Sequence, residues 1–215
     1  MDILDWGQRE LIVFIVVMAG LYPLVAWGNR KALMREEKRQ AAWALMAGPL
    51  GLTYERGGTL TGEREGLAVR IGTEAGEKLG GVKENSTVYV MRVAVPGKLP
   101  RDFVAAPRKW ASLLETVGAL NVFKAGEPVL DKAHIFQSAH VEAGRKLIQD
   151  PDVQQALRGL VNPEGVSFVQ GDHVGLAFQT STFLEDAGKV HHTLELLVRA
   201  AHALAKAQER LQLAA

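Results

Sequence analysis

The feature that most constrains this chain is an uncharged stretch near its start. No charged residue occurs from Leu11 to Trp27, and Arg30 and Lys31 follow soon after. As a helix, this stretch spans roughly 26 Å, slightly less than the ~30 Å hydrocarbon core of a bilayer. Gly28 lengthens the uncharged run. We therefore predict a transmembrane helix over residues 11–28.

A cleaved signal peptide and a buried core helix are the alternatives for this stretch. A cleaved signal peptide has a basic start and small residues before the cleavage point. Here the first ten residues carry more acidic than basic side chains, and Leu24 stands where a small residue is needed. A helix buried in a soluble core usually shows a polar stripe, which this run lacks. Trp6 and Trp27 flank the run, where amphipathic rings favour the membrane interface.

The charges around the span predict its orientation. The side chains expected to anchor the span in lipid include Leu11, Phe14, Val17, Leu21 and Trp27. The cations that follow it are Arg30, Lys31, Arg35, Lys38 and Arg39, whereas only Arg9 precedes it. The positive-inside rule places the C-terminal side in the cytoplasm. We expect a bacterial-type inner-membrane protein with residues 1–10 outside. The following cations act chiefly as a topology signal, with contact to anionic lipid headgroups as the alternative.

The remainder divides into a helical stalk over residues 29–48, ended by Gly48-Pro49, and a cytoplasmic domain over residues 49–215. Alternating apolar residues and glycine turns predict strands in the first part of this domain, and the segments are Leu52–Arg56, Thr59–Thr61, Leu67–Ile71 and Ser86–Val95. Residues 100–133 are hard to interpret, and a short helix near Trp110–Val117 is the only element predicted there.

The second part of the domain begins with a predicted strand at His134–Ser138 and a helix over about Val141–Gln149. Asp150-Pro151 is a typical helix start, so a second helix should run to about Val161. Residues 165–180 should form a hairpin. We predict a register that puts Phe168 opposite Leu176, because it gathers apolar residues on one face.

A long helix should close the chain. Thr182 and Glu185 have the spacing of a capping box, which predicts a start there and a helix to about Leu211. Residues that are alternately four and three positions apart form a continuous seam along this helix. They are Val190, Leu194, Leu197, Ala201, Leu204, Gln208 and Leu211. We expect this seam to pack on the domain's own sheet, with a coiled coil as the alternative. The fold class is therefore α+β: a transmembrane helix, a mostly antiparallel sheet and a long C-terminal helix.

Composition removes several classes of function. The chain has no cysteine, which excludes disulfides, thiolate nucleophiles and cysteine-based metal sites. Its net charge of +1 and the lack of a basic face argue against nucleic-acid binding. His191 and Glu195 lie one helical turn apart and are weak candidates for a metal site, because no third ligand accompanies them. No cofactor is predicted.

No catalytic arrangement stands out either. Gly57 and Gly62 have the spacing of a phosphate loop, but Glu63 and Arg64 follow where lysine and a hydroxyl are needed. Ser138 with His140 lacks the sharp turn of a hydrolase nucleophile. These observations favour a non-enzymatic accessory, scaffold or assembly subunit of a larger membrane complex. Its expected partners are the lipid bilayer and other subunits, with homo-oligomers left open. The alternatives are a tethered domain that binds a lipid or other apolar ligand, and a tethered hydrolase.

Overall fold

The computed structural model of the chain describes residues 21, 25–27, 30–31, 33–34, 36–75, 87–97, 99–100, 103–108, 121–161, 168–171, 175–180 and 185–213. The chain divides into two units, residues 1–42 and residues 43–215. Every described residue of the first unit is helical. Among the residues described, no helix is both long and apolar enough to cross a membrane. Residues 11–20 of the predicted span lie outside the described part.

The helix that includes residues 36–50 ends at Leu50 and is followed by Gly51. This end lies slightly beyond the predicted end of the stalk. Gly51 has a φ of +62°, a conformation that glycine adopts at low cost. The N–H of Leu52 donates to the carbonyl of Ala47 at 2.9 Å, as in a Schellman cap. The guanidinium of Arg64 donates to the carbonyl of Leu50. This end of the helix belongs to the second unit, in which Trp43 is buried.

The second unit contains a nine-stranded sheet in which every pair is antiparallel. Its strands are β1 (Thr53–Glu55), β2 (Thr59–Arg64), β3 (Leu67–Ala75), β4 (Thr87–Ala94), β5 (Phe103–Pro107), β6 (Val122–Phe123), β7 (His134–Gln137), β8 (Phe168–Gly171) and β9 (Gly175–Thr180). The order across the sheet is β1-β2-β3-β4-β9-β8-β5-β7-β6. The hairpin formed late in the sequence thus lies between β4 and β5.

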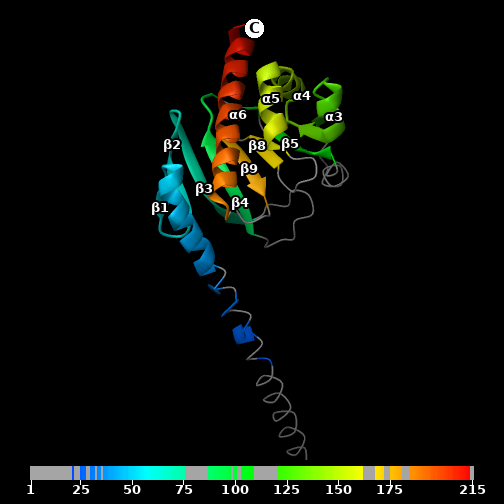
Figure 1. Ribbon diagram of the computed structural model, residues 1–215. Helices are drawn as coiled ribbons and strands as arrows, with labels where there is room; N and C mark the ends of the chain where they lie inside the picture. The colour runs from blue at the N-terminus through cyan, green and yellow to red at the C-terminus, as the bar shows by residue number, and fades with distance from the viewer. Residues whose placement is uncertain are drawn as a thin grey trace, which may run out of the picture. The chain divides into compact units, whose positions relative to one another are not determined.

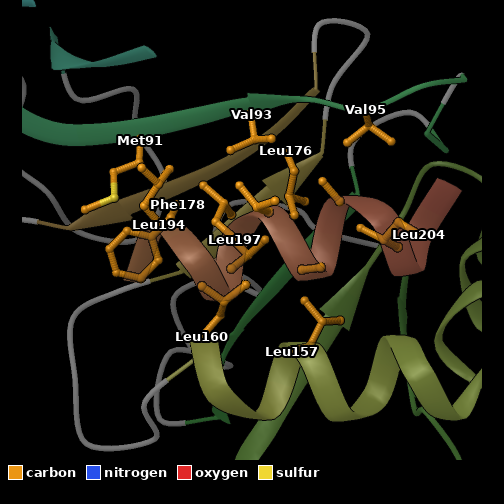
Figure 2. Close-up of a cluster of buried hydrophobic side chains, with 14 of the residues drawn as sticks. Met91, Val93, Val95, Leu157, Leu160, Leu176, Phe178, Leu194, Leu197 and Leu204 are labelled. Carbon is orange, nitrogen blue, oxygen red and sulfur yellow. The ribbon is translucent and has the colours of Figure 1, made fainter. Parts of the chain in front are cut away.

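Helices cover one face of this sheet. They are α3 (Pro128–Ala133), α4 (Val141–Ile148), α5 (Pro151–Leu160) and α6 (Ala187–Leu213). Figure 1 shows α6 lying along the strands, with α5 beside it. In Figure 2, Leu197 of α6 lies between Leu176 of the sheet and Leu157 of α5. The predicted seam is confirmed, because its residues from Val190 to Leu204 are buried against the domain's own sheet and α5.

The prediction of an α+β domain with an antiparallel sheet and a long C-terminal helix is confirmed. The predicted strands before residue 100 and the strand and two helices between residues 134 and 161 are present. Asp150 caps α5, and its carboxylate accepts a hydrogen bond from the N–H of Asp152 at 3.0 Å. The helix predicted near Trp110–Val117 lies outside the described residues.

The predicted register of the late hairpin is wrong. The observed pairs are Phe168–Gln179, Val169–Phe178, Gln170–Ala177 and Gly171–Leu176. The prediction assumed that only one face of the hairpin is buried. Ala177 points to the face opposite Leu176 and Phe178, yet all three are buried. Burial on both faces removes the asymmetry that would have selected the predicted register.

The predicted start of the last helix is also wrong. Glu185 precedes α6 instead of lying in its first turn, and Thr182 lies outside the described residues. The carboxylate of Asp186 accepts from the N–H of Lys189 at 3.0 Å and caps the helix there. Aspartate caps a helix as well as threonine does, so the later position replaces the capping box.

Polar side chains hold the backbone around α3. The carboxylate of Asp131 accepts from the N–H groups of Ala125 at 2.7 Å and Gly126 at 3.0 Å. The ring of His134 is buried, with Nδ1 3.2 Å from the carbonyl oxygen of Leu130 and Nε2 2.8 Å from that of Val161. A neutral ring donates to one of these carbonyls at a time, and an imidazolium donates to both. His134 therefore links the C-terminal ends of α3 and α5.

Candidate functional site

The membrane residues predicted from sequence are only partly described. Leu11, Phe14 and Val17 lie outside the described residues, whereas Leu21 and Trp27 are helical and expose 48% and 60% of their surface. Exposed apolar side chains of this size are unusual on a water-facing helix when they cluster. Val25, Leu33 and Met34 are also exposed.

The predicted topology cations follow Trp27 in the sequence. Arg30, Lys31 and Lys38 are exposed, and Arg35 lies outside the described residues. The ammonium of Lys31 lies 4.1 Å from the centre of the Trp27 ring, within the range of a cation–π interaction. The guanidinium of Arg39 forms an ion pair with Glu36. The side chains of Trp27 and Lys31, four residues apart, thus contact each other on one face of the helix.

The predicted metal pair is close in space but incomplete. Nδ1 of His191 lies 3.7 Å from Oε1 of Glu195, and both side chains are substantially exposed. Within the described part of the chain, no third histidine, cysteine or acid joins them in a group able to hold a metal ion. The two residues are therefore best described as a surface pair on α6.

A concave surface lies between α5 and α6. It has a volume of about 710 Å³, and its lining residues are Glu65, Asp152, Gln155, Ala156, Leu196, Arg199, His202, Ala203 and Lys206. We call this surface the α5–α6 groove. Its floor is apolar, because Ala156, Leu196 and Ala203 line it, and its polar side chains come from three separate elements.

Helix geometry explains why these residues meet. Leu196, Arg199, Ala203 and Lys206 follow a spacing of three and four, so they share one face of α6. This face differs from the one that carries the buried seam. Gly159 of α5 allows close approach, since a Cβ atom built there would lie 3.1 Å from Cδ2 of Leu196. The groove thus follows from a helix that is packed on two sides and open on a third.

Both carboxylates at the groove lie beside a basic side chain. The carboxylate of Asp152 lies 3.2 Å from the guanidinium of Arg210. Nε2 of His202 lies 3.6 Å from Oε2 of Glu65. Arg199 and Lys206 are exposed, and their side chains have no ion-pair partner among the residues that the structure describes. Among the described residues, the uncompensated charge of the groove is therefore positive.

Glu65 reaches the groove from a tight turn. It is one of the two residues between the paired ends of β2 and β3, and its φ is +50°. Glutamate rarely adopts a positive φ, which costs an L-residue about 1–2 kcal/mol. The following Gly66, with a φ of +78°, completes the turn. Two successive positive φ values are typical of a two-residue hairpin turn, and this turn holds the carboxylate of Glu65 next to His202 of α6.

The candidate catalytic residues do not form a reactive site. Ser138 is completely buried, and its hydroxyl accepts a hydrogen bond from the backbone N–H of His140 at 3.2 Å. A nucleophile must instead be accessible to substrate. Gly57 lies in the turn between β1 and β2, as a turn residue would, and its φ is +104°.

Sequence reasoning did not identify the α5–α6 groove. The signal available was the second stripe of α6, in which Leu196 and Ala203 alternate with Arg199 and Lys206. Such a stripe also occurs on an ordinary solvated helix face. The stripe indicates a groove only when the positions of α5 and Glu65 are known. Comparison of the chain with protein-family models, curated proteins and solved structures finds no match.

Proposed function

We propose that this protein is a non-enzymatic accessory subunit, anchored by one membrane helix, whose α+β domain docks onto another protein of a membrane complex. The observation that carries the proposal is the α5–α6 groove, in which uncompensated cations flank an apolar floor. Buried apolar contact surrounded by charge is the usual composition of a protein interface. The scaffold beneath it is rigid, because Leu197 and Leu204 on the inner face of α6 are fully buried.

The membrane part of the proposal rests on the uncharged stretch and on the exposed apolar side chains that end it. Leu21, Val25 and Trp27 present their side chains outward, as helices do in lipid. The cations after residue 29 support a cytoplasmic domain on an inner membrane, because positive charge favours the cytoplasmic side of a span. Lipid is thus the first partner and a protein subunit is the second.

Neither alternative function gains comparable support. A ligand-binding domain needs a cavity, but the described side chains between α6 and the sheet, such as Met91 and Leu197, are packed against each other (Figure 2). A hydrolase needs an accessible nucleophile beside a base, and the described Ser138 is enclosed.

Membrane attachment is tested by washing native membranes with alkaline carbonate. The intact protein should stay in the pellet, and a variant with Val17→Asp and Leu21→Asp should appear in the supernatant. Val129→Asp, at an exposed valine of α3, is the matched control and should behave like the intact protein. Release of the unmodified chain by carbonate would refute the anchor.

Docking is tested by extraction in mild detergent followed by native-size analysis and mass spectrometry. A complex well above the 23.4 kDa chain and its micelle, containing the same companion in repeated preparations, is the expected result. A chain that migrates alone would refute the accessory-subunit proposal.

A further inference from the structure

The two uncompensated cations of the α5–α6 groove have a defined spacing. Arg199 and Lys206 lie seven residues apart on one helix, so their positions along the axis differ by about 10.5 Å. Seven residues are nearly two full turns, so both side chains leave α6 in similar directions. A ligand that satisfies both must offer two anionic groups about 10 Å apart.

The surface between the cations is apolar. Leu196 is half-buried and, with Ala156 and Ala203, forms the floor of the groove. Small and aliphatic side chains leave room for apolar groups of a partner. The ligand should therefore combine separated negative charges with an apolar stripe between them.

The acids at the groove distinguish a peptide from a phosphate-rich surface. Glu65 and Asp152 come from two different elements that line the groove. A membrane surface or a nucleic acid presents phosphates at close spacing, and some would compete with these carboxylates for Arg210 and His202. A protein segment can place acids only where the groove offers cations.

We propose that the α5–α6 groove binds an acidic amphipathic helix of a partner protein, with two carboxylates one heptad apart that pair with Arg199 and Lys206. Such a helix repeats its apolar residues every three or four positions, which matches the floor along α6. The inference rests on the proposed docking function and names the partner's chemistry. His202 and Glu65, which lie 3.6 Å apart, flank the bound helix.

The test uses the full chain in detergent micelles and a fluorescent helical peptide built from alanine and leucine with two glutamates one heptad apart. Anisotropy should show binding that weakens as salt rises. A variant with Arg199→Glu and Lys206→Glu should bind about tenfold more weakly, because two exposed ion pairs of about 0.7 kcal/mol each are lost. A variant with Lys132→Glu and Lys146→Glu, exposed cations of α3 and α4, is the matched control and should bind normally.

Charge exchange makes the test specific. A peptide with lysines in place of the glutamates should bind poorly to the unmodified chain and better to the charge-reversed variant. Equal binding of both peptides to both proteins would overturn the inference. Stronger binding to vesicles of anionic phosphatidylglycerol, lost in the charge-reversed variant, would assign the groove to lipid instead. If the companion found by native-size analysis stays bound to that variant, the inference fails while the docking function stands.

Discussion

Strands β1 to β4 form a meander in which each strand pairs with the next one along the chain, whereas β5, β6 and β7 reach β4 only through β9 and β8. The meander depends on the two short turns that join β1 to β2 and β2 to β3, and on apolar residues that face α6, such as Met91 and Val93. The other end depends on side chains that bind backbone groups, above all Asp131 and His134. One domain thus combines a locally encoded half with a half that needs particular polar residues.

The contact between β4 and β9 joins the two halves of the sheet. We expect substitutions there to lower the free energy of unfolding more than substitutions elsewhere. A Cβ atom at Gly175 would lie 2.2 Å from the carbonyl oxygen of Val93, which is backbone and cannot move aside easily. We expect Gly175→Ala to reduce the free energy of unfolding by about 3 kcal/mol or more, because it separates β9 from β4. Urea unfolding followed by circular dichroism measures the loss.

Gly48→Ala is the matched control for that substitution. Gly48 is helical, and no heavy atom lies within 4 Å of its added Cβ. Alanine favours a helix over glycine by about 1 kcal/mol, so this variant should be as stable as the unmodified chain or slightly more stable. If both substitutions changed the free energy of unfolding equally, the close β4–β9 contact at Gly175 would not be important for stability.

The polar half is tested at His134. His134→Leu removes the donor that faces the carbonyl of Val161 and leaves that acceptor in a buried site. We expect a loss of about 1–3 kcal/mol in the free energy of unfolding. Hydrogen exchange should also quicken first at the ends of α3 and α5. His140→Leu, at an exposed histidine, should change neither quantity, and identical behaviour of both variants would contradict the assigned role.

The meander is tested at its tightest turn. Gly66 has a φ of +78°, and an added Cβ would meet no heavy atom within 4 Å. The cost of Gly66→Ala is therefore conformational, about 1 kcal/mol. Thermal unfolding measures it. A much larger loss would mean that the meander depends on more than turn geometry and would weaken the contrast between the halves.

The smallest expected effect concerns Glu127, which caps α3. Desolvation acts to raise its pKa, but hydrogen bonds from the N–H groups of Leu130 and Val129 and the charge of Arg158 outweigh this, so the pKa lies below its ordinary value of 4.5. Ionised Glu127 therefore stabilises the fold above pH 4.5, and this contribution is lost as pH falls through the lower pKa of the folded state.

Glu127→Gln should accordingly unfold slightly more easily than the unmodified chain at pH 7, and the difference should shrink as pH falls below 4.5. Denaturant titrations of both proteins at pH 7 and below pH 4.5 measure it. Glu142→Gln, at an exposed glutamate of α4, provides the comparison. A difference that grows in acid would have the wrong sign for a carboxylate with a lowered pKa.

The contrast between the halves also explains how far the sequence predicts the fold. Alternation and glycine turns identified β1 to β4, because those strands pair with neighbours along the chain. Asp150-Pro151 marked the start of α5 for a similarly local reason. The position of β9 beside β4 depends on contacts between distant segments, and no local pattern reports them.

The candidate site was even less predictable. The cations Arg199 and Lys206 are visible in the sequence as ordinary surface residues of a helix. They line a groove only because Gly159 allows α5 to approach α6 and because the β2–β3 turn carries Glu65 to the same place. The pair His191 and Glu195 was noticed because its spacing is local, although it lacks a third ligand in the described structure.

The strand order has a consequence for biosynthesis. Because β4 pairs with residues 175–180, a ribosome must translate most of the message before the free edge of β4 finds its partner. Until then, its amide and carbonyl groups can pair with the same edge of another nascent copy. Polysomes that hold several nascent copies close together would increase such encounters, so we expect this protein to need a chaperone during synthesis, and chains truncated before β9 to aggregate.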